Sequence, residues 1–312
     1  MRVVVTGGAG FIGANLCNAL CRRPQVSSVL ALDDLSSGRE ANLDLSGGTE
    51  LVRGSVLDAP LLDSVLERAD SVVHLAARPS VRRSLEDPVG SHEVNVNGTL
   101  EVLEAARRAG VRHLVMASSS SVYGDSEVLP KHEDLPTRPK SPYAASKAAA
   151  ESLCLAWSAS YGIEVLALRF FNVFGPLQPA GHAYAAVVPT FVRAALAGEP
   201  LPVEGDGHQT RDFTFVGLVV SVVSRAVLER VSCPGPINLA AGWRTSLLGL
   251  AAALEAVLGR PLARRHLAPR PGDVRHSQAD TSRLRTLFGP LEPPSLEEGL
   301  RQTVGWWRAQ LA

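Results

Sequence analysis

Tyr143 and Lys147, in the segment SPYAASK, are the residues whose types and spacing suggest chemistry most directly. Residues four apart on a helix lie one turn apart on the same face. An ammonium group close to a phenol favours the phenolate, so the pair can act as a general base on a hydroxyl near neutral pH. Tyr and Lys at this spacing are also common on solvated helix faces. Their surroundings in the sequence therefore have to decide between the two interpretations.

Two other segments supply that context. The run MASSSSVYG at 116–124 ends an apolar strand with serine hydroxyls, which lie where a ligand would meet the carboxyl edge of a parallel sheet. The segment VVVTGGAGFIG places Gly7, Gly10 and Gly13 between a strand and a helix, as a dinucleotide pyrophosphate requires. Asp33 follows about 20 residues later, where a carboxylate accepts hydrogen bonds from ribose hydroxyls and repels a 2′-phosphate. The sequence therefore favours NAD over NADP. The alternative to a dinucleotide site is a glycine-rich turn with a purely structural role, with Asp33 as a loop acid.

These groups need a fold that brings them to one edge of a sheet, and the first half of the chain predicts such a fold. Short apolar runs typical of strands buried on both faces alternate with helical segments near 11–22, 59–68, 91–109 and 143–160. The runs are Val3–Thr6, Val29–Leu32, Ser71–Leu75, Leu114–Ser118 and Val165–Phe170. This alternation predicts an α/β fold with a doubly wound parallel sheet of Rossmann type.

After Phe171 the chain becomes rich in proline and glycine, as in GPLQPAG at 175–181, which is typical of loops that carry substrate contacts. We expect a Rossmann domain over 1–172, joined by a later segment near 213–240. The region 173–312 is expected to form mainly a smaller α/β domain that binds substrate.

Composition limits the partners. The chain has 312 residues, of which 46% are hydrophobic, and 31 basic side chains balance 31 acidic ones. No global charge attracts nucleic acid or a membrane surface, and no apolar run reaches the roughly 18 residues of a membrane span. The four cysteines show no metal-ligand spacing, and we expect reduced thiols and no bound metal. With no secretory leader in the sequence, we expect a cytoplasmic protein.

Seven ordered motifs together resemble the extended short-chain dehydrogenase/reductases of the NAD-dependent epimerase/dehydratase family, which act on nucleotide sugars. The motifs are TGGAGFIG (6–13), HLAA (74–77), NVNGT (95–99), SSSSVYG (118–124), YAASK (143–147), RFFNVFGP (169–176) and RDF (211–213), and the resemblance covers essentially the whole chain. The resemblance implies a catalytic triad of Ser119, Tyr143 and Lys147. It implies NAD contacts from Tyr143, Lys147 and the residues Gly7, Gly10, Phe11, Ile12, Gly13, Asp33, Val56, Leu75, Ala76, Ala77 and Asn95.

The resemblance also implies a UDP-sugar substrate. Arg211 and Arg270 resemble the diphosphate contacts of the family, and Asn172 resembles a contact to the sugar diphosphate. Arginine suits this task because its planar fork binds two phosphate oxygens. The chain departs from the family in one place: Gly54-Ser55-Val56 replaces the usual Gly-Asp-hydrophobic segment after the third strand. This change removes a carboxylate contact near the adenine and concerns NAD affinity rather than the chemistry.

Family reactions share oxidation at sugar C4 and differ in the next step. Dehydratases place Asp and Glu directly after the catalytic hydroxyl residue, and decarboxylases commonly keep the Glu. This chain has Ser120 and Ser121, which supply no acid or base at neutral pH. The sequence therefore favours a UDP-hexose 4-epimerase, an isomerase, over a dehydratase, a decarboxylase or a simple reductase. A non-catalytic NAD-binding regulator is a further alternative on this fold.

The sugar stays open among glucose, N-acetylglucosamine and glucuronate. The residue aligned with Ser277 acts as a gate beside the sugar in related epimerases, and Gln178 falls where N-acetyl-tolerant relatives carry an amide. Both can equally be ordinary loop residues. For glucuronate, the serines at 119–121 with a nearby arginine are the candidate carboxylate contacts. The family resemblance and the segments 91–109 and 143–160 also suggest a homodimer.

Overall fold

The chain forms two compact units in a computed structural model that describes residues 1–180, 185–268 and 274–311. The first unit contains Met1–Gly124, Thr137–Phe170 and Val220–Ile237. The second contains Asp125–Pro136, Phe171–Val219 and the chain from Asn238 onward. The Tyr–Lys helix and the glycine turn lie in the first unit, while Asn172, Arg211 and Ser277 lie in the second.

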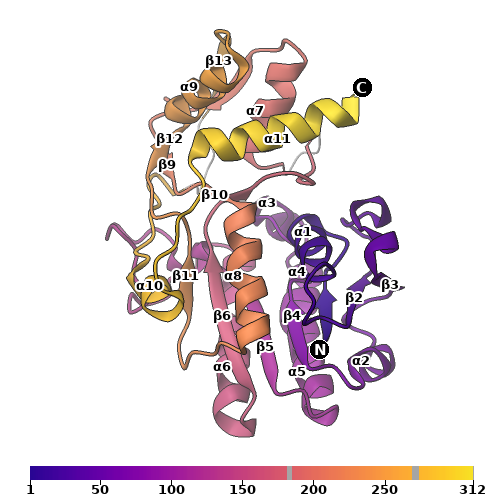
Figure 1. Ribbon diagram of the computed structural model, residues 1–312. Helices are drawn as coiled ribbons and strands as arrows, with labels where there is room; N and C mark the ends of the chain where they lie inside the picture. The colour runs from indigo at the N-terminus through magenta and orange to yellow at the C-terminus, as the bar shows by residue number, and fades with distance from the viewer. Residues whose placement is uncertain (181–184, 269–273, 312) are drawn as a thin grey trace. The chain divides into compact units, whose positions relative to one another are not determined.

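The first unit is built on a seven-stranded sheet with the order β11-β6-β5-β4-β1-β2-β3 (Figure 1). The strands from β6 to β3 all pair in parallel. They are β1 (Arg2–Thr6), β2 (Ser28–Asp33), β3 (Thr49–Arg53), β4 (Ser71–His74), β5 (His113–Ser119) and β6 (Glu164–Phe170), and β11 (Ile237–Leu239) completes the sheet. The chain winds outward from β1 in both directions, so the predicted doubly wound α/β fold is confirmed. The order reverses between β1 and β4, which is where such sheets bind ligands.

Helices cover both faces of this sheet (Figure 1). On one face lie α1 (Phe11–Leu20) and most of α8 (Val216–Glu229), and on the other lie α2 (Ala59–Leu66), α5 (Gly98–Arg108) and α6 (Pro142–Tyr161). A fully buried cluster that includes Val4, Val72, Leu103, Leu114 and Val165 packs under the second group. Because these strands are buried on both faces, they read as continuous apolar runs in the sequence.

The helix predicted over 91–109 differs from the structure in one respect. The chain forms α4 (Pro88–His92), then a π-helical turn over Glu93–Asn97, and only then α5. The Gly98 N–H accordingly donates to the Glu93 carbonyl. A π-turn aims one side chain away from the regular helical direction, and such turns are frequent at functional sites. Here the redirected residue is Asn95, which is 1% exposed.

In its described residues, the second unit combines short strand pairs with helices. The parallel pairs are β7 (Val173–Phe174) with β10 (Thr214–Phe215) and β8 (Leu201–Glu204) with β13 (Arg264–Leu267). The antiparallel pair is β9 (Thr210–Arg211) with β12 (Thr245–Ser246). The helices are α7 (Val187–Leu196), α9 (Leu247–Leu258), α10 (Ser282–Phe288) and α11 (Leu296–Leu311).

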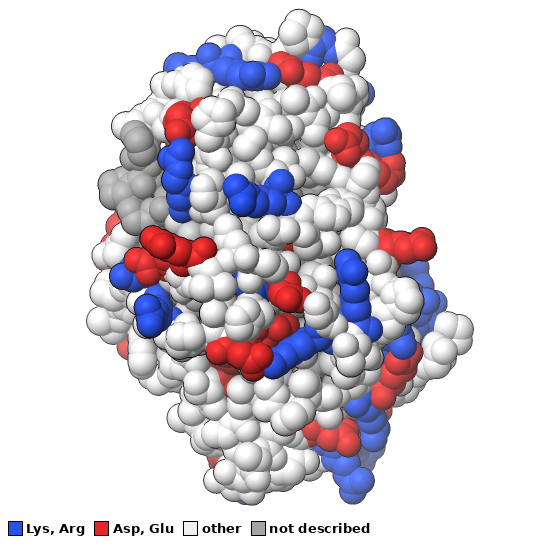
Figure 2. Space-filling model, turned by 90° about the vertical axis from the view of Figure 1, so that its left-hand side faces the viewer, with Lys and Arg blue, Asp and Glu red and all other residues white. Residues whose placement is uncertain are grey.

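The described surface carries mixed charge. Figure 2 shows acidic and basic side chains interspersed over one face of the molecule, without a continuous basic stripe. Among the described residues, no helix is long and apolar enough to cross a membrane. No group of three or more His, Cys, Asp or Glu side chains in the described ranges is placed to hold a metal ion. The four cysteines are free thiols.

Candidate functional site

The glycine turn between β1 and α1 forms a tight cradle. Gly7 has a φ of +69°, and a Cβ added there would lie 2.8 Å from the backbone nitrogen of Ala76. A Cβ on Gly13 would lie 2.1 Å from the Gly7 carbonyl oxygen. Gly10 caps α1 without a side-chain hydrogen bond, so the first-turn N–H groups near Phe11 and Ile12 are left available to bind an anion. The turn thus has the shape and the dipole that a pyrophosphate needs.

Asp33 ends β2 beside this turn and is 7% exposed. Its carboxylate accepts the N–H of Ala9 at 2.9 Å and of Leu35 at 2.8 Å. Burial raises the pKa of Asp33, while these backbone N–H groups lower it. Each carboxylate oxygen has a second lone pair, so Asp33 retains acceptor capacity for ribose hydroxyls. The cradle and this carboxylate together fit a dinucleotide.

The opposite wall of this candidate cofactor site is set by the end of β4. Leu75 donates its N–H to the Thr6 carbonyl at 3.1 Å, and the half-buried Ala76 and Ala77 follow. Asn95 accepts the N–H of Arg78 at 2.7 Å and donates to the Ser146 hydroxyl at 2.9 Å. Asn95 thus ties the segment after β4 to α6, which explains the π-helical turn that aims it.

At the position where the sequence departs from its relatives, Val56 is buried and packs on Gly98. A Cβ on Gly98 would lie 2.7 Å from a Val56 methyl carbon. The Ser55 hydroxyl accepts the N–H of Leu57 at 3.1 Å. Ser55 therefore caps its own turn, and the local backbone is held without a carboxylate.

Ser119 and Tyr143 are brought together in the first unit. Ser119 is the last residue of β5, and its side chain is hydrogen-bonded to the Tyr143 phenol. Ser121 donates its hydroxyl to the Ser119 oxygen at 2.9 Å, in the 3-10 turn over Ser120–Tyr123, where Ser120 and Ser121 are half-buried. Burial raises the pKa of Tyr143, and the bond with Ser119 lowers it. The geometry suits a phenol that exchanges a proton with a bound hydroxyl.

Lys147 lies one turn after Tyr143 on α6 and is 6% exposed. Burial lowers its pKa to about 8, against the opposing effects of Cys154 and Glu151. His74, fully buried between the hydroxyls of Thr6 and Thr99, has its pKa lowered to about 3 by burial and by Lys147. Lys147 is therefore the cation in this cluster, and His74 stays neutral.

The start of α6 shows why the Tyr–Lys helix begins where it does. Ser141 caps the helix by accepting the N–H of Ala144 at 3.1 Å, and Pro142 occupies the first turn. The hydroxyl of Ser84, on α3 (Val81–Glu86), accepts the Tyr143 N–H at 3.0 Å. Ser84 and Ser146 were missed in the sequence, because nothing in the local pattern pairs Ser84 with Tyr143, or Ser146 on α6 with Asn95.

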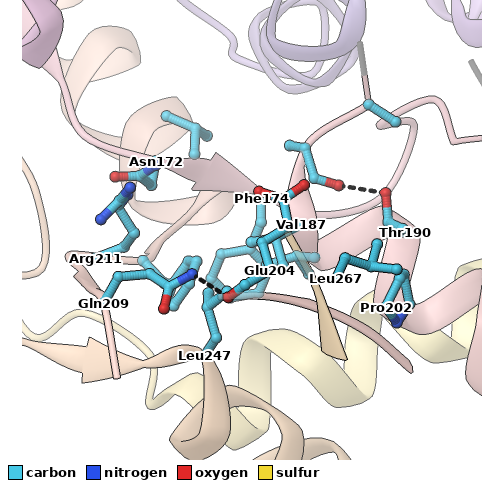
Figure 3. Close-up of a pocket in the computed structure, with 15 residues that line it drawn as sticks. Asn172, Phe174, Val187, Thr190, Pro202, Glu204, Gln209, Arg211, Leu247 and Leu267 are labelled. Atoms are coloured by element: carbon cyan, nitrogen blue, oxygen red, sulfur yellow. Dashed lines mark hydrogen bonds between the residues drawn. The ribbon is translucent and has the colours of Figure 1, made fainter. Parts of the chain in front are cut away.

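The second unit contains a cavity of about 390 Å³, drawn in Figure 3. Asn172 and Arg211 lie side by side at one end, and Val187 at the start of α7 lines another part. Asn172 has a φ of +27°, in the left-handed region that asparagine tolerates. Arg211 donates to the carbonyls of Thr210 at 2.8 Å and Arg275 at 3.3 Å. These bonds orient its guanidinium group.

The other lining residues of this cavity were missed in the sequence. They include Pro202, Glu204, Gln209 and Leu267, and the Gln209 amide donates to the Glu204 carbonyl at 2.7 Å. Pro202 and Glu204 come from β8, Gln209 from the loop before β9 and Leu267 from β13, so no single motif carries them. The cavity is of the size of small-molecule sites, and both apolar side chains and polar groups line it.

Two predicted sugar contacts, Gln178 and Ser277, are not among the residues that line this cavity. Gln178 is buried and donates its amide to the Val173 carbonyl at 3.1 Å, and its side-chain oxygen has no hydrogen-bond partner among the described residues. Ser277 is buried, and its N–H donates to Thr210 at 3.1 Å, next to Arg211. Arg270 lies outside the described residues.

Comparison with known proteins places this geometry in a family. The model of the NAD dependent epimerase/dehydratase family matches residues 3–240. UDP-glucose 4-epimerase of Mycolicibacterium smegmatis is 40% identical, with 99% of each chain covered. UDP-N-acetylglucosamine 4-epimerase from Methanobrevibacter ruminantium, solved with UDP-N-acetylmuramic acid, has a TM-score of 0.93 and 36% identity, covering 99% of this chain and 98% of that one.

A third relative was solved with its cofactor. UDP-glucuronic acid 4-epimerase from Bacillus cereus, in complex with UDP-glucuronic acid and NAD, has a TM-score of 0.89 and 30% identity over the whole of both chains. These matches confirm the expected family and its NAD dependence. The chain belongs to the NAD-dependent epimerase/dehydratase family.

Proposed function

We propose that this chain inverts the configuration at C4 of a UDP-hexose, with Tyr143 as base, Lys147 as the cation that favours its phenolate, and Ser119 as its hydrogen-bond partner. The expected reaction class, a UDP-sugar 4-epimerase and hence an isomerase, is confirmed by relatives of that activity at 30–40% identity. The roles of individual residues are our inference from the contacts described above.

The Tyr143 phenolate takes the proton of the sugar 4-hydroxyl. The Ser119 hydroxyl, hydrogen-bonded to Tyr143, stabilises the Tyr143 oxygen before and after that transfer. The Lys147 ammonium offsets the cost of a buried phenolate. The glycine cradle and Asp33 would hold NAD, which would supply a hydride acceptor for sugar C4 and the source of the returned hydride. The resulting 4-keto sugar has to rotate in the pocket so that it receives the hydride on its other face. Tyr143 then returns the proton.

The observation that carries epimerisation over elimination is the turn after Ser119. Ser120 and Ser121 stand where dehydratases hold acid and base, and the Ser121 hydroxyl donates to Ser119 instead. A hydroxyl group cannot move protons at C5 or C6 near neutral pH. Nothing in this turn competes with return of the hydride, so the 4-keto sugar goes back to a hexose.

We assign the cavity of the second unit to the UDP group. Its apolar side chains suit a nucleoside, and Arg211, Asn172 and the first turn of α7 supply donors for a diphosphate. From the sequence, Arg270 joins them. Gln178, whose side-chain oxygen has no partner in the part of the chain that the structure describes, and the small Ser277 favour a pocket that also admits an N-acetyl group.

A panel of UDP-sugars tests this function. The purified protein, incubated with UDP-glucose, UDP-N-acetylglucosamine and UDP-glucuronate, is expected to give the C4 epimer of at least one, resolved by ion-exchange chromatography. A 4-keto-6-deoxy product or release of CO₂ would instead identify a dehydratase or a decarboxylase. Absence of turnover on every UDP- and dTDP-sugar, with NAD bound, would favour a non-catalytic regulator and refute the proposal.

We also propose a homodimer in the cytoplasm. The exposed residues along α6 include Ala145, Ser152, Ala156 and Ala159, a small and uncharged stripe suited to close helix packing. The free thiols agree with a reducing compartment. A monomeric mass by light scattering at micromolar concentration would reject the dimer.

A further inference from the structure

A buried ion pair lies among the elements that carry the catalytic residues, and the chemistry above does not use it. Glu151 on α6 and Arg169 on β6 have side chains that are 6% and 4% exposed. Their closest contact, from Nη2 to Oε1, is 2.6 Å, and Arg169 Nε donates to Oε2 at 3.0 Å. The Ser118 hydroxyl donates to the same Oε2 at 2.5 Å. Both carboxylate oxygens are therefore engaged.

This network connects three elements. Ser118 directly precedes Ser119 on β5, so its bond to Glu151 ties the end of that strand to α6. The Arg169 guanidinium lies over the fully buried ring of Tyr123, 4.7 Å from its centroid. Tyr123 closes the 3-10 turn that begins at Ser120. One ion pair thus fixes the strand end, the serine turn and the Tyr–Lys helix.

The network also sets the charge around Lys147. Glu151 is four residues after Lys147 on α6, so the two side chains rise from one face of the helix. The charged and titratable groups around Lys147 are Tyr143, Glu151 and the Cys154 thiol on its own helix and His74 on β4, with Arg169 on β6 reaching it through Glu151. Glu151 is the carboxylate of this group, and the Cys154 thiol keeps its proton near neutral pH because burial raises its pKa to about 12.

Stability alone does not account for such a pair. Desolvating two charges costs about as much as their attraction returns, and apolar residues of equal volume often serve as well. An ionised pair at this position makes sense if its geometry and its charge serve the adjacent chemistry.

We propose that Glu151 is a positioning residue of the epimerase site, which holds α6 in register with Ser119 and keeps a compensating anion one turn from Lys147. The proposal rests on the roles assigned above to Ser119, Tyr143 and Lys147. Glu151 touches neither the reacting hydroxyl nor the base and acts through Ser118, Arg169 and Lys147.

The test is Glu151→Gln, which keeps the shape and an acceptor for Ser118 but removes the charge. In the holoenzyme we expect kcat to fall by about 10- to 100-fold with KM changed by less than about threefold, because proton transfer depends steeply on geometry. The alkaline limb of kcat should move to lower pH by about one unit, because Lys147 then faces Arg169 without a neutralising anion.

A second variant separates charge from position. Glu151→Gln combined with Arg169→Gln removes both charges, and it also serves if the single variant fails to fold. The alkaline limb should return toward that of the unmodified enzyme, while kcat stays low because the clamp is missing. The matched control is Glu104→Gln. Glu104 accepts from Trp157 on the same α6 at 2.9 Å, ten residues beyond Lys147, and its variant should leave the pH profile unchanged.

A direct titration keeps this test independent of turnover. The chain has only three lysines, Lys131, Lys140 and Lys147, so ¹³C-lysine NMR resolves each ammonium group. Glu151→Gln should lower the pKa of Lys147, and Glu104→Gln should not. An unchanged Lys147 titration together with kcat within threefold of the unmodified enzyme would overturn the proposal. If the enzyme turned over no UDP-sugar, the proposed function would fail, and this titration would still judge the role of Glu151.

Discussion

Lys147 should make the protein less stable at neutral pH while making it active. Its folded pKa of about 8 lies below the ordinary lysine value of 10.5, with burial as the largest cause. The difference, at about 1.4 kcal/mol per pH unit, corresponds to about 3 kcal/mol. Below pH 8 both folded and unfolded chains carry the proton, and the folded chain bears this full cost.

The sign of the pH dependence follows from proton binding. Between about pH 8 and 10.5 the unfolded chain binds the proton that the folded chain has lost, so the free energy of unfolding rises with pH in this window. Lys147→Met removes the titrating group and keeps a long apolar side chain. We expect this variant to be more stable than the unmodified protein by about 3 kcal/mol at pH 7, and the gain should shrink to nearly zero by about pH 10.5. Its turnover should be abolished.

Urea unfolding of cofactor-free protein at several pH values measures both curves, and removing the cofactor keeps lost NAD contacts out of the comparison. The matched control is Lys140→Met at an exposed lysine, which should leave the pH dependence unchanged. The result that contradicts this prediction is a constant difference, from pH 7 to pH 10, between the free energies of unfolding of the Lys147 variant and the unmodified protein. In that case the protein would fully compensate the desolvation of the Lys147 ammonium, and the predicted pH dependence would be wrong.

Four further substitutions test the assigned roles. Tyr143→Phe should lower kcat by at least about two orders of magnitude and leave UDP-sugar binding by calorimetry intact, because only the base is lost; near-normal turnover would remove Tyr143 from the mechanism. In binding titrations, Asp33→Ala should weaken NAD binding and reduce the preference for NAD over NADP, and unchanged affinities for both cofactors would contradict the contact between Asp33 and the ribose. Gly13→Ala places a methyl group 2.1 Å from the Gly7 carbonyl, so NAD affinity should fall at least about tenfold, with a lower melting temperature. Ser277→Tyr should abolish turnover of UDP-N-acetylhexosamines and spare UDP-glucose; an unmodified enzyme inactive on N-acetylated sugars would rule out the roomy pocket.

The first unit could be predicted from sequence because its signals are local. The Gly7–Gly13 turn needs glycine where the backbone closes on itself, as the contacts of a Cβ at either end show. Tyr143 and Lys147 need only the period of a helix. The five predicted strand runs match β1, β2, β4, β5 and β6 to within one residue at each end, because these strands are largely buried on both faces and read as continuous apolar runs. β3 was not among those runs, since most of its residues are half-buried or exposed.

Residues that act through tertiary contacts were not predictable in this way. Ser84 meets Tyr143 across 59 positions of sequence, and the π-helical turn at Asn95 exists because its side chain bonds to residues of two other segments. The cavity of the second unit draws Val187, Pro202 and Leu267 from three separate elements. A single sequence contains no periodicity that links such positions.

The buried charges of the first unit explain why its sequence pattern identifies some functional residues and misses others. A chain selected only for stability would replace Lys147, Glu151 and Arg169 by apolar side chains, since each bears a desolvation cost. Lys147 reveals itself through its spacing from Tyr143, because the two must share a helix face. Glu151 and Arg169 come from α6 and β6 and are joined only when the helix packs on the sheet. Groups that touch the reacting atoms are therefore found by motif, whereas groups that hold them in place become visible only once the helix and the sheet are assembled.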